Sequence, residues 1–261
     1  MDLEQITPLI LTFNEEPNLD RTLRALTWAR EVVVLDSGST DRTNDICASY
    51  PNVRVVVRKF DSHSRQWNYG LQECGIRTEW VLALDADYHA TPELVEEFRQ
   101  LQPDDTVSGY RTGFRYCVEG KPLSGTLYPP VVTLYRRARA HYIQDGHTQR
   151  AVIQGTVVDA RNILLHDDRK ALARCLGSQD NYATLEVDLL AKHPWGKLSW
   201  QDRIRRMIFV APILVPLYCL TVGKGYKDGW HGLFYAMHRG VAEAILSLKL
   251  LEAKYKAAAK R

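Results

Sequence analysis

The sequence lacks the features that mark disulfide-rich, zinc-knuckle and nucleic-acid-binding proteins. Its five cysteines are an odd number, lie far apart and form no CxxC pair, so neither a disulfide framework nor a zinc site is indicated. A net charge of only +3 over 261 residues predicts no nucleic-acid partner. The first residues carry no basic segment and no cleavage site, so we expect no signal peptide and a reducing, cytosolic environment.

The chain also lacks an apolar run long enough to span a bilayer. Its longest run, residues 207–222, is shorter than the ~20 residues that a span needs, and Pro212 and Pro216 interrupt it. Basic residues flank the run on both sides: Arg203, Arg205, Arg206, Lys224 and Lys227. This pattern predicts a peripheral or monotopic anchor on the inner, cytoplasmic face of the cell membrane, and a buried core helix or a dimer contact is the alternative.

What the sequence has, up to about residue 105, is an alternation of strand-like and helix-like segments. Predicted strands cover 6–11, 32–35, 53–57 and 80–84, and predicted helices cover 41–50 and 63–74, with others after Asn14 and from Thr91. Strands that alternate with helices in this way form a parallel sheet with right-handed crossovers. Further strands at 106–116, 131–136, 150–158 and 163–166 predict an antiparallel extension, and a long helix is expected over 168–192.

Polar side chains follow three of the four predicted parallel strands. The strand ends read Thr12-Phe13-Asn14-Glu15, Asp36-Ser37-Gly38-Ser39-Thr40-Asp41 and Asp85-Ala86-Asp87. One such end alone is explained by ordinary turn chemistry. The carboxyl ends of parallel strands share one edge of the sheet, where ligands bind, so three together indicate a site.

Asp85 and Asp87 carry the sharpest chemical signal. Alternate residues of an extended segment point the same way, so the two carboxylates share one face. They repel each other unless a cation lies between them, and Mg²⁺ or Mn²⁺ bridging to a diphosphate relieves that repulsion. The simpler alternative is a strand end followed by a helix cap.

These three motifs, in this order and spacing, resemble those of glycosyltransferase family 2. The resemblance implies a GT-A fold, an α/β architecture with a mostly parallel sheet and an antiparallel extension, and inverting transfer from a nucleotide-diphosphate sugar. The short chain and its tail are also similar to small bacterial enzymes that add a glucose-type sugar to lipopolysaccharide core or related glycolipids. The implied partners are therefore a nucleotide-sugar donor, with UDP-hexose preferred, and a lipid-linked or saccharide acceptor.

The resemblance also implies roles for individual residues. Thr12, Asn14 and Glu15 would surround the nucleoside, Asp36 would accept from the uracil N3–H, Asp85 would lie near the ribose and diphosphate, and Asp87 would hold the metal. His89 stands where some members carry a metal-binding glutamine, and imidazole is an acceptable Mn²⁺ ligand. The common second motif has two adjacent acids, whereas this chain has Asp36-Ser37.

Other residues complete the expected site. Arg65 on the third predicted helix would face the diphosphate, or would simply be solvated. Similar enzymes carry a His-Glu pair in this region, but here Thr148 follows His147 in place of the glutamate. The general base is therefore expected at Asp145, with His147 as second choice. The alternative is that Asp145 only belongs to an Asp-Gly turn. Tyr116 and Tyr128 would form an aromatic wall, and a late His166 would complete the metal or diphosphate shell.

The expected organisation is a GT-A catalytic domain over residues 1–194 and a helical, membrane-associating tail over 195–261. Within the domain, residues 1–105 form the nucleotide-binding half and 106–194 the acceptor half. A nucleotidyltransferase of related fold is one alternative, but it would carry a Gly-rich basic loop where this chain reads TFNEEPNLDR. A non-catalytic membrane-associated sugar-binding protein is the other, and it would have no need of Asp85 and Asp87.

Overall fold

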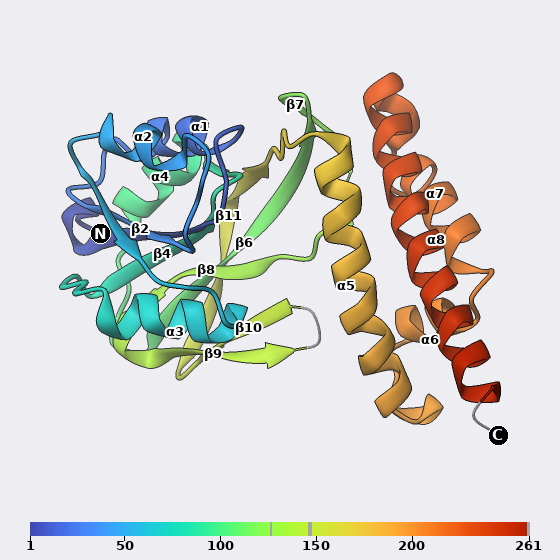
Figure 1. Cartoon of the computed structure of the whole chain (residues 1–261). Coiled ribbons are helices and arrows are strands. Elements are labelled where there is room, and N and C mark those ends of the chain that lie inside the picture. The colour runs from blue at the N-terminus through green and yellow to red at the C-terminus, as the bar shows by residue number, and fades with distance from the viewer. Residues whose placement is uncertain (126, 146–147, 260–261) are drawn as a thin grey trace. The chain divides into compact units, whose positions relative to one another are not determined.

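The computed structural model describes residues 1–125, 127–145 and 148–259, and the chain divides into two compact units (Figure 1). Unit 1 comprises Met1–Pro122 and Tyr128–Arg169, and unit 2 comprises Leu123–Leu127 and Lys170–Arg261. Each unit has its own secondary structure and its own packed interior.

Unit 1 is built on one mixed sheet. Its strands lie in the order β3 (Val53–Val57), β2 (Val32–Asp36), β1 (Ile6–Thr12), β4 (Trp80–Asp85), β8 (Val131–Arg136), β6 (Val107–Val118), β11 (Thr156–His166) and β5 (Tyr88–Ala90), with β7 (Lys121–Pro122) paired to β6. The first four strands are mutually parallel, and β8 runs antiparallel to both β4 and β6. β11 is parallel to β6, and β5 is antiparallel to β11. The predicted α/β class, a parallel half with an antiparallel extension, is confirmed.

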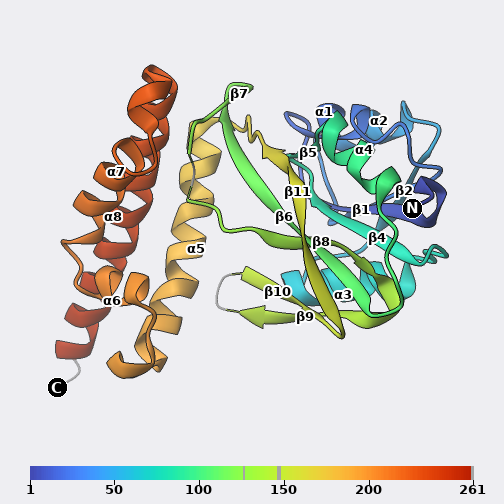
Figure 2. The same cartoon turned by 180° about the vertical axis from the view of Figure 1, so that it is seen from behind.

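Helices cover both faces of the parallel half (Figures 1 and 2). α1 (Leu19–Arg24), α2 (Thr43–Ala48) and α4 (Pro92–Gln100) lie on one side, and α3 (His63–Glu73) lies on the other. The strands are buried on both faces: Val32 and Val34 belong to the core under α1 and α4, and Val33 and Leu35 belong to the core under α3. Continuous apolar runs are what a doubly covered parallel sheet requires.

Some local expectations were wrong. α1 begins at Leu19 rather than after Asn14, because Asn14 has a left-handed φ of 56° and turns the chain instead. The strand expected over 150–158 is broken at Gly155, whose φ is 118° and whose position leaves no room for a side chain beside Ser108. β10 (Thr148–Ile153) therefore pairs with β9 (Ala140–Asp145) in a separate two-stranded sheet. The single-turn helices η1 (Leu3–Gln5) and η2 (Arg137–Arg139) complete unit 1.

Unit 2 is helical. It contains α5 (Leu172–Lys192), α6 (Trp200–Arg206), α7 (Ala211–Leu220) and α8 (Trp230–Ala258), joined partly by η3 (Trp195–Lys197) and η4 (Gly225–Asp228). Among the described helices, none has the length and apolar character needed to cross a bilayer.

α5 belongs to unit 2 because it packs against α8. Ala183 and Leu190 of α5 form a buried cluster with Leu198 and Leu246. The Arg205 guanidinium pairs with Glu186 at 3.6 Å and with Glu243 at 3.2 Å, which ties α6 to α5 and α8. The compact division therefore falls after Arg169, earlier than the functional boundary expected after residue 194.

Candidate functional site

The loop after β2 is organised by the Asp36 carboxylate. Asp36 is fully buried, and its two oxygens accept from Gly38 N at 2.9 Å, from Ser39 N at 2.8 Å, from Thr12 Oγ1 at 3.0 Å and from the Ser39 hydroxyl. Gly38 has a φ of 93°, a conformation that favours glycine. Because four donors occupy its acceptor sites, Asp36 shapes this loop, and its predicted contact with the base stays a prediction.

The loops after β1 and β2 are joined by side-chain hydrogen bonds. Asn14 Oδ1 accepts from Thr40 N at 2.7 Å, and Asn14 N donates to Ser39 Oγ at 2.7 Å. Glu15 N donates to Thr43 Oγ1 at 2.7 Å. The structure therefore brings Thr12, Asn14, Glu15 and Asp36 to one edge of the sheet, as their strand-end positions indicated.

Asp87 meets a histidine from a distant strand. Its carboxylate Oδ2 lies 3.2 Å from His166 Nε2, and both side chains are almost completely buried. The backbone of this turn is also fixed: Thr22 Oγ1 donates to Ala86 O at 2.6 Å, and Asp167 N donates to Asp87 O at 3.0 Å. The Asp-Ala-Asp turn is thus held between α1 and the end of β11.

His166 lies in an aromatic and acidic environment. The rings of Tyr88, Tyr116 and Tyr128 contact it edge to face, with centroids at 5.0, 4.8 and 5.0 Å. Burial alone would lower the pKa of His166, but the Asp87 carboxylate, helped by Asp85, outweighs it and raises the pKa. Burial, then Asp85 and Asp87, raises the pKa of the Tyr88 hydroxyl well above its usual value. The charges of Asp85 and Asp87 thus act on both Tyr88 and His166.

The Asp87–His166 pair fits a divalent cation in its chemistry. One carboxylate oxygen and one imidazole nitrogen already converge, and Mn²⁺ accepts both ligand types. Within the described ranges no group of three or more His, Cys, Asp or Glu side chains forms a metal cage. A cation here would therefore need phosphate or water oxygens to fill its remaining positions.

His89 lies in β5, where it pairs with Leu165 of β11. Burial, and then the Arg21 guanidinium, lowers the pKa of His89 against the opposing effect of Asp167. Its expected part in holding the metal stays a prediction. The residue that the structure places against Asp87 is His166, which the sequence suggested only as a late addition to the shell.

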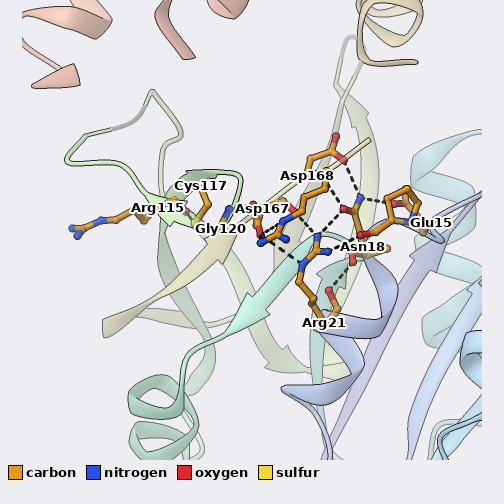
Figure 3. A network of polar contacts seen from close by, with 12 residues as sticks. Glu15, Asn18, Arg21, Arg115, Cys117, Gly120, Asp167 and Asp168 are labelled. Atoms are coloured by element: carbon orange, nitrogen blue, oxygen red, sulfur yellow. Dashed lines mark hydrogen bonds and ion pairs between the residues drawn. The ribbon is translucent and has the colours of Figure 1, made fainter. Parts of the chain in front are cut away.

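A buried polar network joins the segment after β1 to the segment after β11 (Figure 3). Asn18 is completely buried, and its Nδ2 donates to Glu15 Oε2 at 3.0 Å and to Asp168 Oδ1 at 2.9 Å. Asp167 accepts from Gly120 N at 3.0 Å and pairs with Arg169 at 2.9 Å. Sequence reasoning missed Asn18, because an asparagine before a helix is an ordinary capping residue.

Arg65, which was expected either near a diphosphate or in solvent, lies in the first turn of α3. Its side chain is 75% exposed, and its contacts in the described part of the chain are an ion pair with Asp61 at 3.7 Å and the cap bond to Ser62. Arg58, which sequence reasoning missed, binds Asp61 at 2.9 Å and lies over the Tyr69 ring. A role for Arg65 in donor binding stays a prediction.

The predicted general bases are Asp145, the last residue of β9, and His147, which precedes β10 in the sequence. The backbone of Asp145 ends β9, but its side chain, and His147 entirely, lie outside the described residues. The choice between the two stays a prediction.

Comparison with known proteins gives consistent sequence relatives. Residues 9–153 match the family model "Glycosyl transferase family 2". The chain is 27% identical to the Rhizobium meliloti (strain 1021) "Lipopolysaccharide core biosynthesis glycosyltransferase LpsC", over 95% of this chain and 92% of that protein. An "Uncharacterized glycosyltransferase" of Rickettsia bellii (strain RML369-C) is 31% identical over 38% of this chain and 33% of its own length.

Two solved structures are also similar. The S. aureus TarS fragment 1–349 in complex with UDP-GlcNAc has a TM-score of 0.49 and 15% identity, covering 97% of this chain and 92% of that one. Glucosyl-3-phosphoglycerate synthase from Mycobacterium tuberculosis in complex with phosphoglyceric acid has a TM-score of 0.47 and 15% identity, covering 70% and 81%.

Proposed function

The chain belongs to glycosyltransferase family 2 and acts on nucleotide sugars, and we propose that it moves a hexose from a UDP-sugar, with inversion, to a hydroxyl of a glycolipid or polysaccharide. The observation that supports this most is the Asp87–His166 contact at the sheet edge where the β1 and β2 loops are joined. The relationship to LpsC, which is named for lipopolysaccharide core biosynthesis, favours a saccharide acceptor.

Asp87 and His166 would hold Mn²⁺ or Mg²⁺, and the cation would neutralise charge on the departing diphosphate. Asp85 would lie beside them toward the ribose. Asp36 keeps the β2 loop closed, so that this loop and Asn14 present a fixed surface to the nucleoside. A fixed donor lets the acceptor approach the anomeric carbon from the face opposite the leaving group.

The acceptor hydroxyl must lose a proton as the new bond forms, and we assign that step to Asp145, with His147 as second choice. Tyr116 and Tyr128 are stacked at 5.8 Å with 7° between their planes, and both touch His166. They would form a wall for the sugar beside the metal position.

A donor screen tests this function. Incubation with UDP-glucose, UDP-galactose and UDP-N-acetylglucosamine in Mn²⁺ should release UDP slowly from at least one donor. Asp87→Asn should abolish most of that release, because losing a metal ligand costs several kcal/mol of transition-state stabilisation. Asp159→Asn, at an exposed carboxylate paired with Arg111, is the matched control and should turn over normally.

Other outcomes separate the alternatives. Release of pyrophosphate from a nucleoside triphosphate, in place of UDP release, would indicate a nucleotidyltransferase. Binding of sugar without turnover of any donor would indicate a binding protein. Equal turnover in Asp87→Asn and wild type would remove the metal assignment.

We further propose that unit 2 lies on the inner face of the cytoplasmic membrane. Trp230, Phe234, Met237 and Val241 recur at helical spacing on α8 and are 83%, 50%, 61% and 43% exposed. A second set of exposed apolar residues lies on α7 and just before it: Phe209, Ile213, Leu214, Leu217 and Tyr218. Two apolar stripes of this kind suit the boundary between headgroups and acyl chains.

Charge favours an anionic leaflet as the occupant of this surface. Lys224 and Lys227 are exposed in the connection between α7 and α8. Each basic residue near such a surface contributes roughly 1 kcal/mol of attraction. An acceptor anchored in the same leaflet would then meet a donor supplied from water.

Sedimentation with vesicles tests this placement. Full-length protein should pellet with phosphatidylglycerol vesicles, and a Trp230→Glu, Phe234→Glu double variant should stay in the supernatant. The control is Val57→Glu, which charges an apolar side chain of unit 1 that is 67% exposed. If wild type fails to pellet, or if the control loses binding as much as the double variant, the stripes are contacts to protein and the proposal fails.

A further inference from the structure

We propose that Asn18 is a positioning residue that links the nucleotide side of the donor site to its metal side. Its amide bridges Glu15, which follows β1, and Asp168, which follows β11 and His166. This inference rests on the proposed function, in which Glu15 and His166 take part in donor binding.

All the hydrogen-bonding capacity of the Asn18 amide is used (Figure 3). Nδ2 donates to Glu15 Oε2 at 3.0 Å and to Asp168 Oδ1 at 2.9 Å. Oδ1 accepts from Arg21 Nη2 at 3.0 Å and from Arg169 N at 2.9 Å. Two N–H groups and two lone pairs are what a side-chain amide offers, and the residue has no exposed surface.

Asn18 occupies the N-cap position of α1 but makes no capping hydrogen bond. An asparagine in this position normally bonds an N–H group of its own helix. Here the amide bonds the side chains of Glu15 and Arg21 nearby and reaches Asp168 and Arg169 N in a distant segment. It must donate to two carboxylates and accept from a guanidinium, a combination that neither a carboxylate nor an apolar side chain reproduces.

The link extends to the Asp-Ala-Asp turn. Asp167, next to Asp168, donates its backbone N–H to Asp87 O at 3.0 Å. Holding Asp168 through Asn18 therefore also restrains the turn that carries Asp87. Without the amide, this link between the β1 loop and the turn is lost, while Arg21 and Thr22 of α1 still bond Asp167 O and Ala86 O. The two segments are then held less firmly relative to each other, and a ligand that needs both loses affinity.

Calorimetric titration of UDP, with and without Mn²⁺, measures the link without any turnover. The dissociation constant of UDP without Mn²⁺, divided by that with Mn²⁺, is the gain in UDP affinity that the cation confers, and we call it the Mn²⁺ gain. In Asn18→Asp a third carboxylate would face Glu15 and Asp168. Both hydrogen bonds donated by Nδ2 are lost. We expect the Mn²⁺ gain to fall about tenfold or more, which is at least the effect of one hydrogen bond to a charged group, while UDP affinity without metal changes little.

The matched control is Asn162→Asp. Asn162 is half-buried on β11, and its Nδ2 donates to Glu97 Oε2 at 2.9 Å, so the same substitution breaks the same kind of bond elsewhere. Its Mn²⁺ gain should equal that of wild type. The Asn18→Asp, Asp168→Asn double variant exchanges amide and carboxylate and should recover part of the lost gain.

The outcomes are distinct. Wild type that binds no UDP in Mn²⁺ overturns the proposed function and this inference with it. If wild type shows the Mn²⁺ gain, and Asn18→Asp and Asn162→Asp show equal gains, then the role of Asn18 is overturned and the proposed function is not affected. If Asn18→Asp does not fold, Asn18→Ala, which removes the amide without adding a charge, takes its place in the titration, and a gain there equal to that of wild type also overturns it.

Discussion

The Asp36 carboxylate lies at the carboxyl end of β2, and both of its oxygens accept hydrogen bonds from nearby residues. Its partners are Thr12 on β1 and the two residues Gly38 and Ser39 of the loop that follows. Because donors of the protein already occupy its acceptor sites, this buried carboxylate holds the loop in one conformation and has little capacity left to bind a ligand. The base site would then depend on Asp36 through the loop, whether or not the carboxylate touches uracil.

Asp36→Asn should therefore lower both stability and UDP affinity. An amide nitrogen would face backbone N–H groups, and losing a charged hydrogen bond costs ~1.5–3 kcal/mol. We expect a lower melting temperature and a larger loss of affinity for UDP than for pyrophosphate. Asp45→Asn, at an exposed position on α2, should change neither. Equal losses for UDP and pyrophosphate would mean that the loop does not serve the base.

Four of the five cysteines should react slowly with thiol reagents because they are buried. Burial raises the pKa of Cys47 to about 12 and that of Cys117 to about 11, and Cys74 and Cys219 are also buried. A thiol reacts as thiolate, and a raised pKa leaves almost none at pH 8. Titration with a chromogenic disulfide at pH 8 should show fast reaction at Cys175 only, and all five thiols in denaturant. Several fast thiols in the native protein would contradict the burial.

At the scale of elements, α7 approaches α8 through a glycine. A side chain on Gly240 would begin 2.7 Å from Pro216 Cγ, so the missing Cβ lets the proline of α7 sit against α8. The helix that carries Pro216 therefore depends on this contact as well as on its own hydrogen bonds.

Gly240→Ala should destabilise unit 2, although alanine favours helices by up to ~1 kcal/mol. Overpacking of a close contact costs ~1–3 kcal/mol, which exceeds that gain. Gly177→Ala on α5 is the control, because nothing lies within 4 Å of its missing Cβ, and it should raise stability. Calorimetric melting of both variants checks the prediction, and a stabilised Gly240→Ala would show that α7 does not pack as described.

At the scale of the whole molecule, the two units divide the proposed work. Unit 1 carries every described residue assigned to the donor, and unit 2 carries the exposed apolar stripes. Truncation before α6 is a poor test of the tail, because it would uncover Ala183 and Leu190 of α5. Point changes in the full chain keep that core intact.

Salt should release the protein from anionic vesicles only in part. Raising the ionic strength from about 0.1 M to about 1 M shortens the screening length from ~10 Å to ~3 Å, which weakens attraction to Lys224 and Lys227. The apolar stripes do not depend on this attraction, so detergent should complete the release. Complete release by salt alone would mean that the stripes do not enter the lipid.

The sequence alone was enough for the parallel half of unit 1 and for the sheet edge at which Thr12, Asn14 and Asp36 gather. Buried parallel strands are continuous apolar runs, and the ends of such strands meet at one edge whatever the rest of the chain does. Val53–Val57 was predicted to the residue, and Asp36, Asp85 and Asp87 follow from the same local reasoning.

Only the tertiary structure decided which distant side chains meet. Asp87 pairs with His166 because β5, which follows Asp87, is adjacent to β11 in one register, and Asn18 bonds Asp168 in the segment after β11. That register depends on packing across the sheet, and no local periodicity encodes it. The same holds for Asn18, whose amide is an ordinary helix cap in sequence and a bridge between two loops in the folded chain, because burial leaves it no partner but those that the fold brings to it.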